Sequence, residues 1–171
     1  PGAFVCTSSD VANVLREYER FSTAAMNAFV GPSTSYYLSN LQEKLVSQGY
    51  RANLRVIQSN GSISTVEACS QRAVTMLMSG PAGGVIGGKS EGLWCGTRNM
   101  ITVDIGGTSA DISTIPDGHI KIMNARDSYV SGHPILVPMI DLVTIGAGGG
   151  SIAYVDSAGG FHVGPRSAGA D

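Results

Sequence analysis

MITVDIGGTSADISTI, residues 100–115, predicts two antiparallel strands joined by a glycine turn. Apolar and polar residues alternate over 101–105, as in a strand with one face buried. Gly106 and Gly107 then interrupt the pattern, because glycine tolerates the backbone angles of a tight turn. A second strand follows over 109–115. Pro116-Asp117-Gly118 is a turn triplet, and residues 119–122 have strand character, so we expect a three-stranded antiparallel meander.

The first turn of this meander carries groups that can bind a phosphate and a metal ion. Successive backbone N–H groups in such a turn can form an anion-binding nest, hydroxyls add donors, and carboxylates can hold Mg²⁺ beside the phosphate. The candidate groups are the amides of Gly106, Gly107 and Thr108, the hydroxyls of Thr108 and Ser109, and the carboxylates of Asp104 and Asp111. The alternative is a plain hairpin in which both carboxylates only cap the turn.

A second glycine loop covers residues 146–150, and we expect Gly148, Gly149 and Gly150 to line the floor of a nucleotide cleft. It is not a dinucleotide-binding fingerprint, because no helix and no acidic residue about 20 positions on follow it. Residues 152–156 and 161–163 instead predict a hairpin, with an irregular tail from 164.

The remaining segments predict helices around these strands. Apolar residues at helical spacing indicate one helix from about 8–10 to Gly31-Pro32 and a second from about 33–35 to 48. A short strand at 54–58 precedes a helix that begins at the capping box Ser64-x-x-Glu67 and ends near 78. Residues 83–94 predict a further helix with a flat face of four glycines at 83, 84, 87 and 88. Within it, residues 88–92 match G-x-S-x-G, which we interpret as a chance match.

Composition narrows the function classes. At 171 residues, with 43% hydrophobic residues, the chain predicts a single domain spanning 1–171. A net charge of −2 without a basic face argues against nucleic acid as a partner. Three widely spaced cysteines argue against structural zinc and a disulfide framework and favour a cytoplasmic protein. No run of 18 apolar residues occurs, so no membrane span is expected. Because the chain begins at Pro1, we expect a piece of a longer polypeptide.

Several segments, in order along the chain, resemble the hydantoinase A and 5-oxoprolinase family, which includes the nucleotide-binding subunit of acetone carboxylase. They are residues 16–20 with 22–23, 79–84, 104–109, 145–153 and 163–170. Asp-x-Gly-Gly-Thr at 104–108 also resembles the phosphate hairpin of actin- and hexokinase-type ATPases. The resemblance implies an α/β lobe of ribonuclease-H-like architecture, a mixed sheet with an antiparallel meander and packed helices.

The resemblance also implies an activity: ATP- and Mg²⁺-dependent opening of a cyclic amide such as hydantoin, N-methylhydantoin or 5-oxoproline, through phosphorylation of the carbonyl oxygen. Asp104 and Asp111 would be the catalytic and metal-binding residues. An N-terminal lobe with a second phosphate hairpin is missing from this chain, and a hydantoinase B-type subunit is a possible partner. The phosphate hairpin of the superfamily often has a hydroxyl residue near its second aspartate, whereas here Ala110 precedes Asp111, so residue 110 can supply no hydroxyl. The alternatives are a carboxylase subunit, a chaperone-like ATPase switch and an acetate-kinase-like phosphotransferase.

Overall fold

The computed structural model describes residues 3–169, which form two compact units. Unit 1 comprises the chain up to Gly83 together with Ile122–Ile140, and unit 2 comprises Gly84–Lys121 and the chain from Asp141 onward. Ala170, the last residue of the tail segment, lies outside the described residues. Among residues 3–169, no helix is long and apolar enough to cross a membrane.

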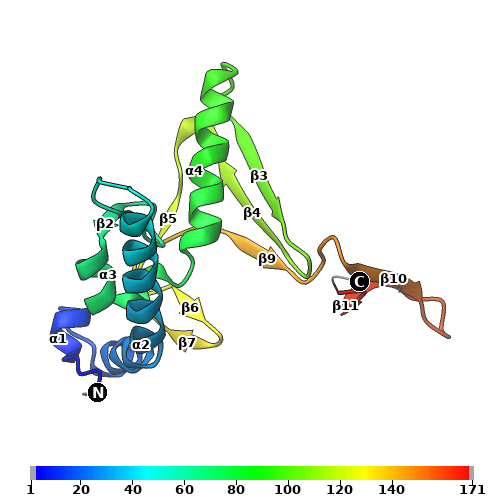
Figure 1. The fold of residues 1–171 in the computed structure, drawn as a ribbon. Helices are drawn as coiled ribbons and strands as arrows, with labels where there is room; N and C mark the ends of the chain where they lie inside the picture. The colour runs from blue at the N-terminus through cyan, green and yellow to red at the C-terminus, as the bar shows by residue number, and fades with distance from the viewer. Residues whose placement is uncertain (1–2, 170–171) are drawn as a thin grey trace. The chain divides into compact units, whose positions relative to one another are not determined.

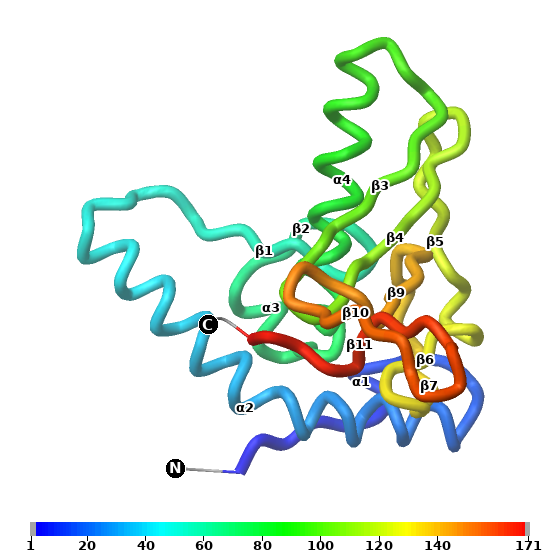
Figure 2. Tube along the Cα trace, turned by 90° about the vertical axis from the view of Figure 1, so that its right-hand side faces the viewer, coloured from blue at the N-terminus to red at the C-terminus, as the bar shows by residue number. Residues whose placement is uncertain are grey.

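Unit 1 combines helices with short hairpins (Figures 1 and 2). Its helical elements are α1 (Ser8–Val11), α2 (Glu17–Ser47), α3 (Val66–Gln71) and the 3₁₀ turn η1 (Ala73–Met76). Its strands pair antiparallel as β1 (Arg55–Ile57) with β2 (Ile63–Thr65), β5 (Ile122–Met123) with β8 (Met139–Ile140), and β6 (Tyr129–Val130) with β7 (His133–Pro134). Thr65, not Ser64, caps α3, because its side chain accepts from the Ala68 amide.

Helix α2 is one continuous helix, so the predicted break at Gly31-Pro32 is wrong. Gly31 is buried in α2, and a Cβ there would overlap the Phe4 ring, so this glycine serves close packing and not a helix end. The buried face carries polar anchors: Asn27 donates to the Gln71 carbonyl at 3.0 Å and accepts from the Val74 amide at 3.1 Å. Several large apolar side chains of α2, such as that of Phe29 at 80% exposure, face outward.

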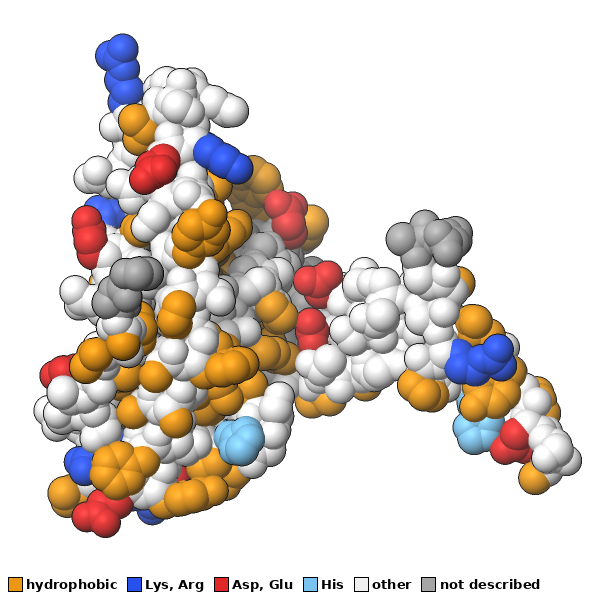
Figure 3. All heavy atoms as spheres, turned by 60° about the horizontal axis from the view of Figure 1, so that its bottom comes forward, with side chains coloured by type: hydrophobic (Ala, Val, Ile, Leu, Met, Phe, Trp, Pro, Cys, Tyr) orange, Lys and Arg blue, Asp and Glu red, His pale blue; other side chains and the backbone are white. Residues whose placement is uncertain are grey.

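The described part of unit 1 contains small apolar clusters. One is formed by Val11, Val74, Ile135, Val137 and Met139, and another by Leu38, Val66 and Cys69. Each draws side chains from segments far apart in sequence. Figure 3 shows hydrophobic side chains at the surface of the region that carries α2, consistent with the outward-facing aromatic residues of that helix.

Unit 2 is built on a three-stranded antiparallel sheet in the order β3 (Met100–Ile105), β4 (Ala110–Ile115), β9 (Val143–Ile145). The predicted β3–β4 hairpin is confirmed. The predicted third strand is wrong: residues 116–118 form the 3₁₀ turn η2 (Pro116–Gly118), and Ile122 pairs with Ile140 in unit 1. The free edge of β4 is filled by β9 from much later in the chain. Every strand pair among residues 3–169 is antiparallel, so the mixed sheet is not seen in this part.

Helix α4 (Ser79–Trp94) confirms the predicted glycine-rich helix, but with a different glycine face. A Cβ at Gly84, Gly88 or Gly92 would meet Asp104, Thr102 or Met100 of β3, respectively, whereas a Cβ at Gly87 would meet nothing within 4 Å. Four helical residues rise about 6 Å and two strand residues about 6.6 Å, so this spacing keeps glycine opposite every second strand residue. Glycine therefore lets α4 lie close against β3.

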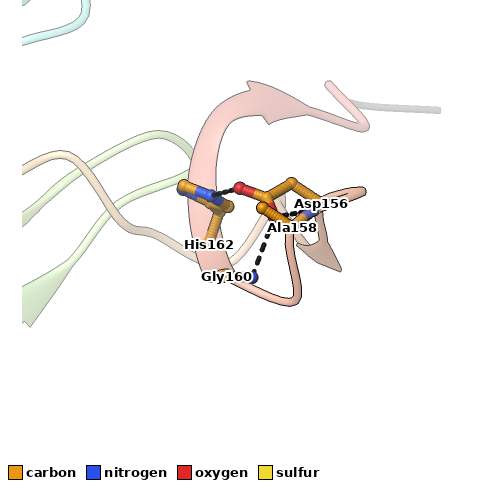
Figure 4. Close-up of polar contacts among 4 residues, drawn as sticks. All are labelled: Asp156, Ala158, Gly160 and His162. Carbon is orange, nitrogen blue, oxygen red and sulfur yellow. Dashed lines mark hydrogen bonds and ion pairs between the residues drawn. The ribbon is translucent and has the colours of Figure 1, made fainter.

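The chain then forms a hairpin of β10 (Ser151–Val155) and β11 (Phe161–Ser167), which confirms the predicted hairpin but extends it beyond residue 164. Asp156 closes its turn (Figure 4). One Asp156 oxygen accepts from the Ala158 and Gly160 amides, and the other bonds to Nε2 of His162 at 2.7 Å. These contacts, that of His162 first, hold the pKa of Asp156 below its ordinary value.

Candidate functional site

Three polar side chains form a row across the sheet of unit 2. Asp104 of β3 lies opposite Asp111 of β4, and Asp111 lies opposite Thr144 of β9. Residues directly opposite in antiparallel strands share a face, with Cβ atoms about 4.5–5.5 Å apart. Thr144 Oγ1 donates to Asp111 Oδ1 at 2.5 Å. The two predicted carboxylates are therefore brought together on one face of the sheet.

Thr144 was missed by the sequence reasoning. Its only signal is its place between Val143 and Ile145, which puts its side chain on the opposite face from theirs. The alternation shows on which face of its strand Thr144 lies, but it does not show which strand pairs with β9. Residue 110, where the superfamily hairpin could carry a hydroxyl, is alanine in this chain. The hydroxyl that contacts Asp111 belongs instead to Thr144 of β9.

The face that carries Asp104 and Asp111 is also the face against which α4 packs. A Cβ at Gly84 would lie 3.3 Å from Oδ2 of Asp104. A larger residue at 84 would therefore press on this carboxylate. The absence of a side chain at Gly84 leaves the Asp104 carboxylate exposed beside the helix.

The glycine turn between β3 and β4 is closed by its own backbone. The Gly106 amide donates to the Ser109 carbonyl at 2.9 Å, so this amide is not available to a ligand. The turn residues Gly107 and Thr108 are exposed, and no protein acceptor bonds to their amides among residues 3–169. The predicted nest is thus reduced to two amides, with the Thr108 and Ser109 hydroxyls beside them.

The two predicted glycine loops lie directly against each other. The amides of Gly149 and Gly150 donate to the carbonyls of Gly106 and Gly107 at 2.9 and 2.8 Å. A Cβ at Gly148 would lie 2.6 Å from the Gly106 oxygen and 2.7–2.8 Å from the Ser109 and Thr108 nitrogens. Only glycine fits there. The second loop therefore supports the turn through its backbone.

The donor set suits a hydrated divalent ion that bridges to a phosphate. Mg²⁺ is usually held by one or two carboxylates, with water and phosphate oxygens completing its shell. Asp104 and Asp111 could provide those two carboxylates. Within the described part of the chain, no cluster of three or more His, Cys, Asp or Glu side chains could hold a metal ion by itself.

The G-x-S-x-G match does not form a nucleophile site. Ser90 lies inside α4, whereas a nucleophile elbow needs a strand-to-helix turn, so the interpretation as a chance match is confirmed.

The chain is similar in sequence to several known enzymes. It is 40% identical over its whole length to caprolactamase subunit alpha of Pseudomonas jessenii, and 33% identical over 98% of its length to 5-oxoprolinase of Saccharomyces cerevisiae. It spans 24% of the first protein and 13% of the second, so it corresponds to about a quarter or less of these relatives.

Solved structures agree with the sequence relatives. The crystal structure of the ATP-dependent caprolactamase of Pseudomonas jessenii matches 96% of this chain with a TM-score of 0.76 and 37% identity. The nucleotide-free structure of acetone carboxylase, an enzyme of ATP-dependent acetone carboxylation, matches 94% with a TM-score of 0.79 and 29% identity. The chain covers 24% and 22% of those chains. Because the hydantoinase/oxoprolinase family also matches over residues 20–171, the chain belongs to the hydantoinase/oxoprolinase family.

Proposed function

We propose that this chain is the Mg-ATP-binding part of an enzyme that uses ATP to open a cyclic amide. The observation that carries the proposal is the row of Asp104, Asp111 and Thr144 on the sheet face next to the glycine turn. Carboxylates beside exposed amides and hydroxyls are what a magnesium-bound phosphate chain requires. The ATP dependence of the caprolactamase and of acetone carboxylation supports the same reading.

Each group has a role in this proposal. Asp104 and Asp111 would hold Mg²⁺, directly or through water, and Thr144 would fix the orientation of the Asp111 carboxylate. The amides of Gly107 and Thr108 and the hydroxyls of Thr108 and Ser109 would donate to phosphate oxygens. Gly106 allows the turn, and Gly148, Gly149 and Gly150 hold it in place.

ATP would activate the substrate by transferring its γ-phosphoryl group to the amide carbonyl oxygen. A first water would then attack the carbonyl carbon, and breaking of the ring C–N bond would release the amine and leave an acyl phosphate. A second water would attack this acyl phosphate, giving the free carboxylate and phosphate. The groups of unit 2 that this proposal uses are those of a phosphate and metal site. We propose that a second lobe, within a longer polypeptide of ribonuclease-H-like architecture, and a partner subunit complete the site. The name of the caprolactamase relative, a subunit alpha, supports the partner.

A carboxylase is the second candidate, favoured by the structural match to acetone carboxylase. Here the same phosphoryl transfer would activate a substrate for addition of carbon dioxide instead of water. Measuring phosphate release distinguishes the two functions. Phosphate release that requires bicarbonate indicates a carboxylase, and phosphate release with a cyclic amide alone indicates a hydrolase.

Asp104→Asn tests the proposal in the complete protein. The change keeps the size of the side chain but removes the charge that would hold Mg²⁺, so we expect ATP-dependent opening of hydantoin, 5-oxoproline or related lactams to be lost while the fold is kept. Phosphate release and ring opening are measured together. Asp117→Asn is the matched control, because Asp117 is an exposed carboxylate outside the row, in η2, and it pairs with Arg98. Parental rates in Asp104→Asn would show that this carboxylate only caps the turn.

A further inference from the structure

Unit 1 contains a small polar cavity of about 210 Å³ that is separate from the carboxylate row of unit 2. Its lining residues are Gln58, Asn60, Arg72, Thr75, Val137 and Pro138. They come from the turn between β1 and β2, from the region around η1, and from the segment before β8. Cavities for drug-sized ligands usually measure about 300–1,000 Å³, so this one suits a small molecule or one functional group.

The turn that forms one wall is held rigidly. Ser59 is fully buried; its hydroxyl donates to the Thr75 carbonyl at 2.7 Å and accepts from the Met78 amide at 3.2 Å. The Ser62 amide donates to Oδ1 of Asn60 at 2.9 Å. Gln58 is held at both ends, by Ser62 and by Thr75. A wall fixed in this way loses little freedom when a ligand binds.

The hydrogen bonds leave the cavity with donors and few free acceptors. Thr75 Oγ1 donates its single proton to the Arg72 carbonyl, so Gln58 must present its Nε2 to that oxygen. Oδ1 of Asn60 accepts from the amide and the hydroxyl of Ser62, and within residues 3–169 no acceptor bonds to Nδ2, which can therefore donate to a ligand. Through Nη2, Arg72 donates to the Val11 carbonyl at 2.8 Å. Its other N–H groups make no ion pair with a carboxylate among residues 3–169.

Arg72 is the one charged residue among those that line the cavity, and no lining residue carries a carboxylate, so the cavity suits an anion. Its single positive charge balances a carboxylate, whereas a phosphate group near neutral pH carries about −1.5 to −2. Arginine recognises carboxylates through its planar fork of N–H groups. Val137 and Pro138 provide an apolar wall for a short hydrocarbon part. We infer that this cavity is a binding site for the carboxylate group of a small organic acid, held by Arg72 and Asn60.

Asn60→Asp is the sharpest test, because it keeps the oxygen that accepts from Ser62 and replaces the donor with a negative group. Binding of propionate to the complete protein, without Mg²⁺, is followed by ligand-observed NMR. Losing a hydrogen bond to a charged group should weaken binding roughly tenfold or more. Asn99→Asp is the matched control, because Oδ1 of Asn99 likewise accepts a backbone amide, that of Asp117, in an exposed turn.

Arg72→Lys is a second variant, in case Asn60→Asp does not fold; it keeps the charge and removes the planar fork, and it should also weaken propionate binding. Saturable propionate binding that is lost in these variants and kept in Asn99→Asp is the expected result. Propionate binding that never saturates, or that is unchanged in Asn60→Asp and Arg72→Lys, overturns the inference. Inorganic phosphate binding more tightly than propionate, with the same sensitivity to Asn60→Asp, overturns the carboxylate assignment.

Discussion

Thr144 and Asp111 show how single contacts define the candidate site. The hydroxyl of Thr144 lies 2.5 Å from Asp111, and a hydrogen bond to a charged group both fixes and stabilises it. Asp104 has a different environment, with the open position of Gly84 beside it. The two carboxylates of the row are therefore held differently, although they lie opposite each other in the sheet.

Thr144→Val should impair the use of Mg²⁺, because valine has nearly the same shape and lacks the hydroxyl. Losing one hydrogen bond to a carboxylate is worth about 1.5–3 kcal/mol, or roughly ten- to a hundredfold. The measurement is the Mg²⁺ concentration that gives half-maximal ATP-dependent activity in the complete protein. Thr144→Ser keeps the hydroxyl and should behave like the parent. An unchanged Mg²⁺ requirement in Thr144→Val would remove Thr144 from the site.

Asp156 gives a prediction about pH. Its pKa lies below the ordinary value because His162, Gly160 and Ala158 bond to the carboxylate. A carboxylate with a lowered pKa stabilises the folded state above its unfolded pKa of about 3.9, and that stabilisation disappears as the pH falls through the folded value. His162→Ala removes the largest contact, so the Asp156 pKa should rise toward its ordinary value. NMR titration of the Asp156 carboxyl carbon measures this, and an unchanged pKa would mean that the backbone amides alone set it.

At the scale of elements, the packing of helix α4 depends on which of its glycines contact the sheet. Gly84, Gly88 and Gly92 face β3 at every fourth position, whereas Gly87 points into open space. Glycine normally weakens a helix by about 1 kcal/mol relative to alanine. The packing of α4 on β3 offsets that cost only at the positions where a side chain would collide with the strand.

Substitutions to alanine should therefore have opposite signs along α4. Gly88→Ala places a methyl group against Thr102 and should lower the free energy of unfolding by roughly 1–3 kcal/mol, as overpacking does. Gly87→Ala, one residue away, should raise it by up to about 1 kcal/mol, because alanine favours the helix. Denaturant unfolding of both variants decides the question. Equal stability of the two would mean that α4 does not pack on β3 through this face.

At the scale of the whole molecule, the sheet of unit 2 has one face packed by α4 and another that is apolar and exposed. Ile101, Val103, Ile105 and Val143 on that second face are 54–70% exposed. A large exposed apolar patch commonly marks an interaction surface. It supports the proposal that the chain works within a longer polypeptide whose other segments cover this face.

The 171-residue chain by itself should therefore fold but bind Mg-ATP weakly and hydrolyse nothing. A phosphate site between two lobes takes donors from both, and each charge-assisted hydrogen bond contributes about 1.5–3 kcal/mol. Losing several of them weakens binding by orders of magnitude, since about 1.4 kcal/mol is tenfold in the dissociation constant. Calorimetry with an ATP analogue, on the chain and on the complete protein, compares the two. Robust hydrolysis by the isolated chain would contradict the two-lobe proposal.

The sequence by itself determined the local parts of this protein. The β3–β4 and β10–β11 hairpins and the helix α4 could be predicted because their pairing partners and turn residues are neighbours in the chain. Asp104, Asp111 and the glycine turn could be assigned to one candidate site because they lie within the same hairpin. Short-range geometry and side-chain alternation are sufficient for such features.

Only the tertiary structure decided the long-range choices. The second neighbour of β4 is selected by competition between segments far apart in the chain. The structure places β9 there instead of residues 119–122. Helix α2 continues through Gly31 and Pro32, and its partners at this point, the Phe4 ring beside Gly31 and the backbone groups bonded to Asn27, come from outside the helix. The contact of the two glycine loops, and of Thr144 with Asp111, depends on the same long-range pairing. Local patterns show which face a residue occupies, but the free energy of packing selects what lies opposite it.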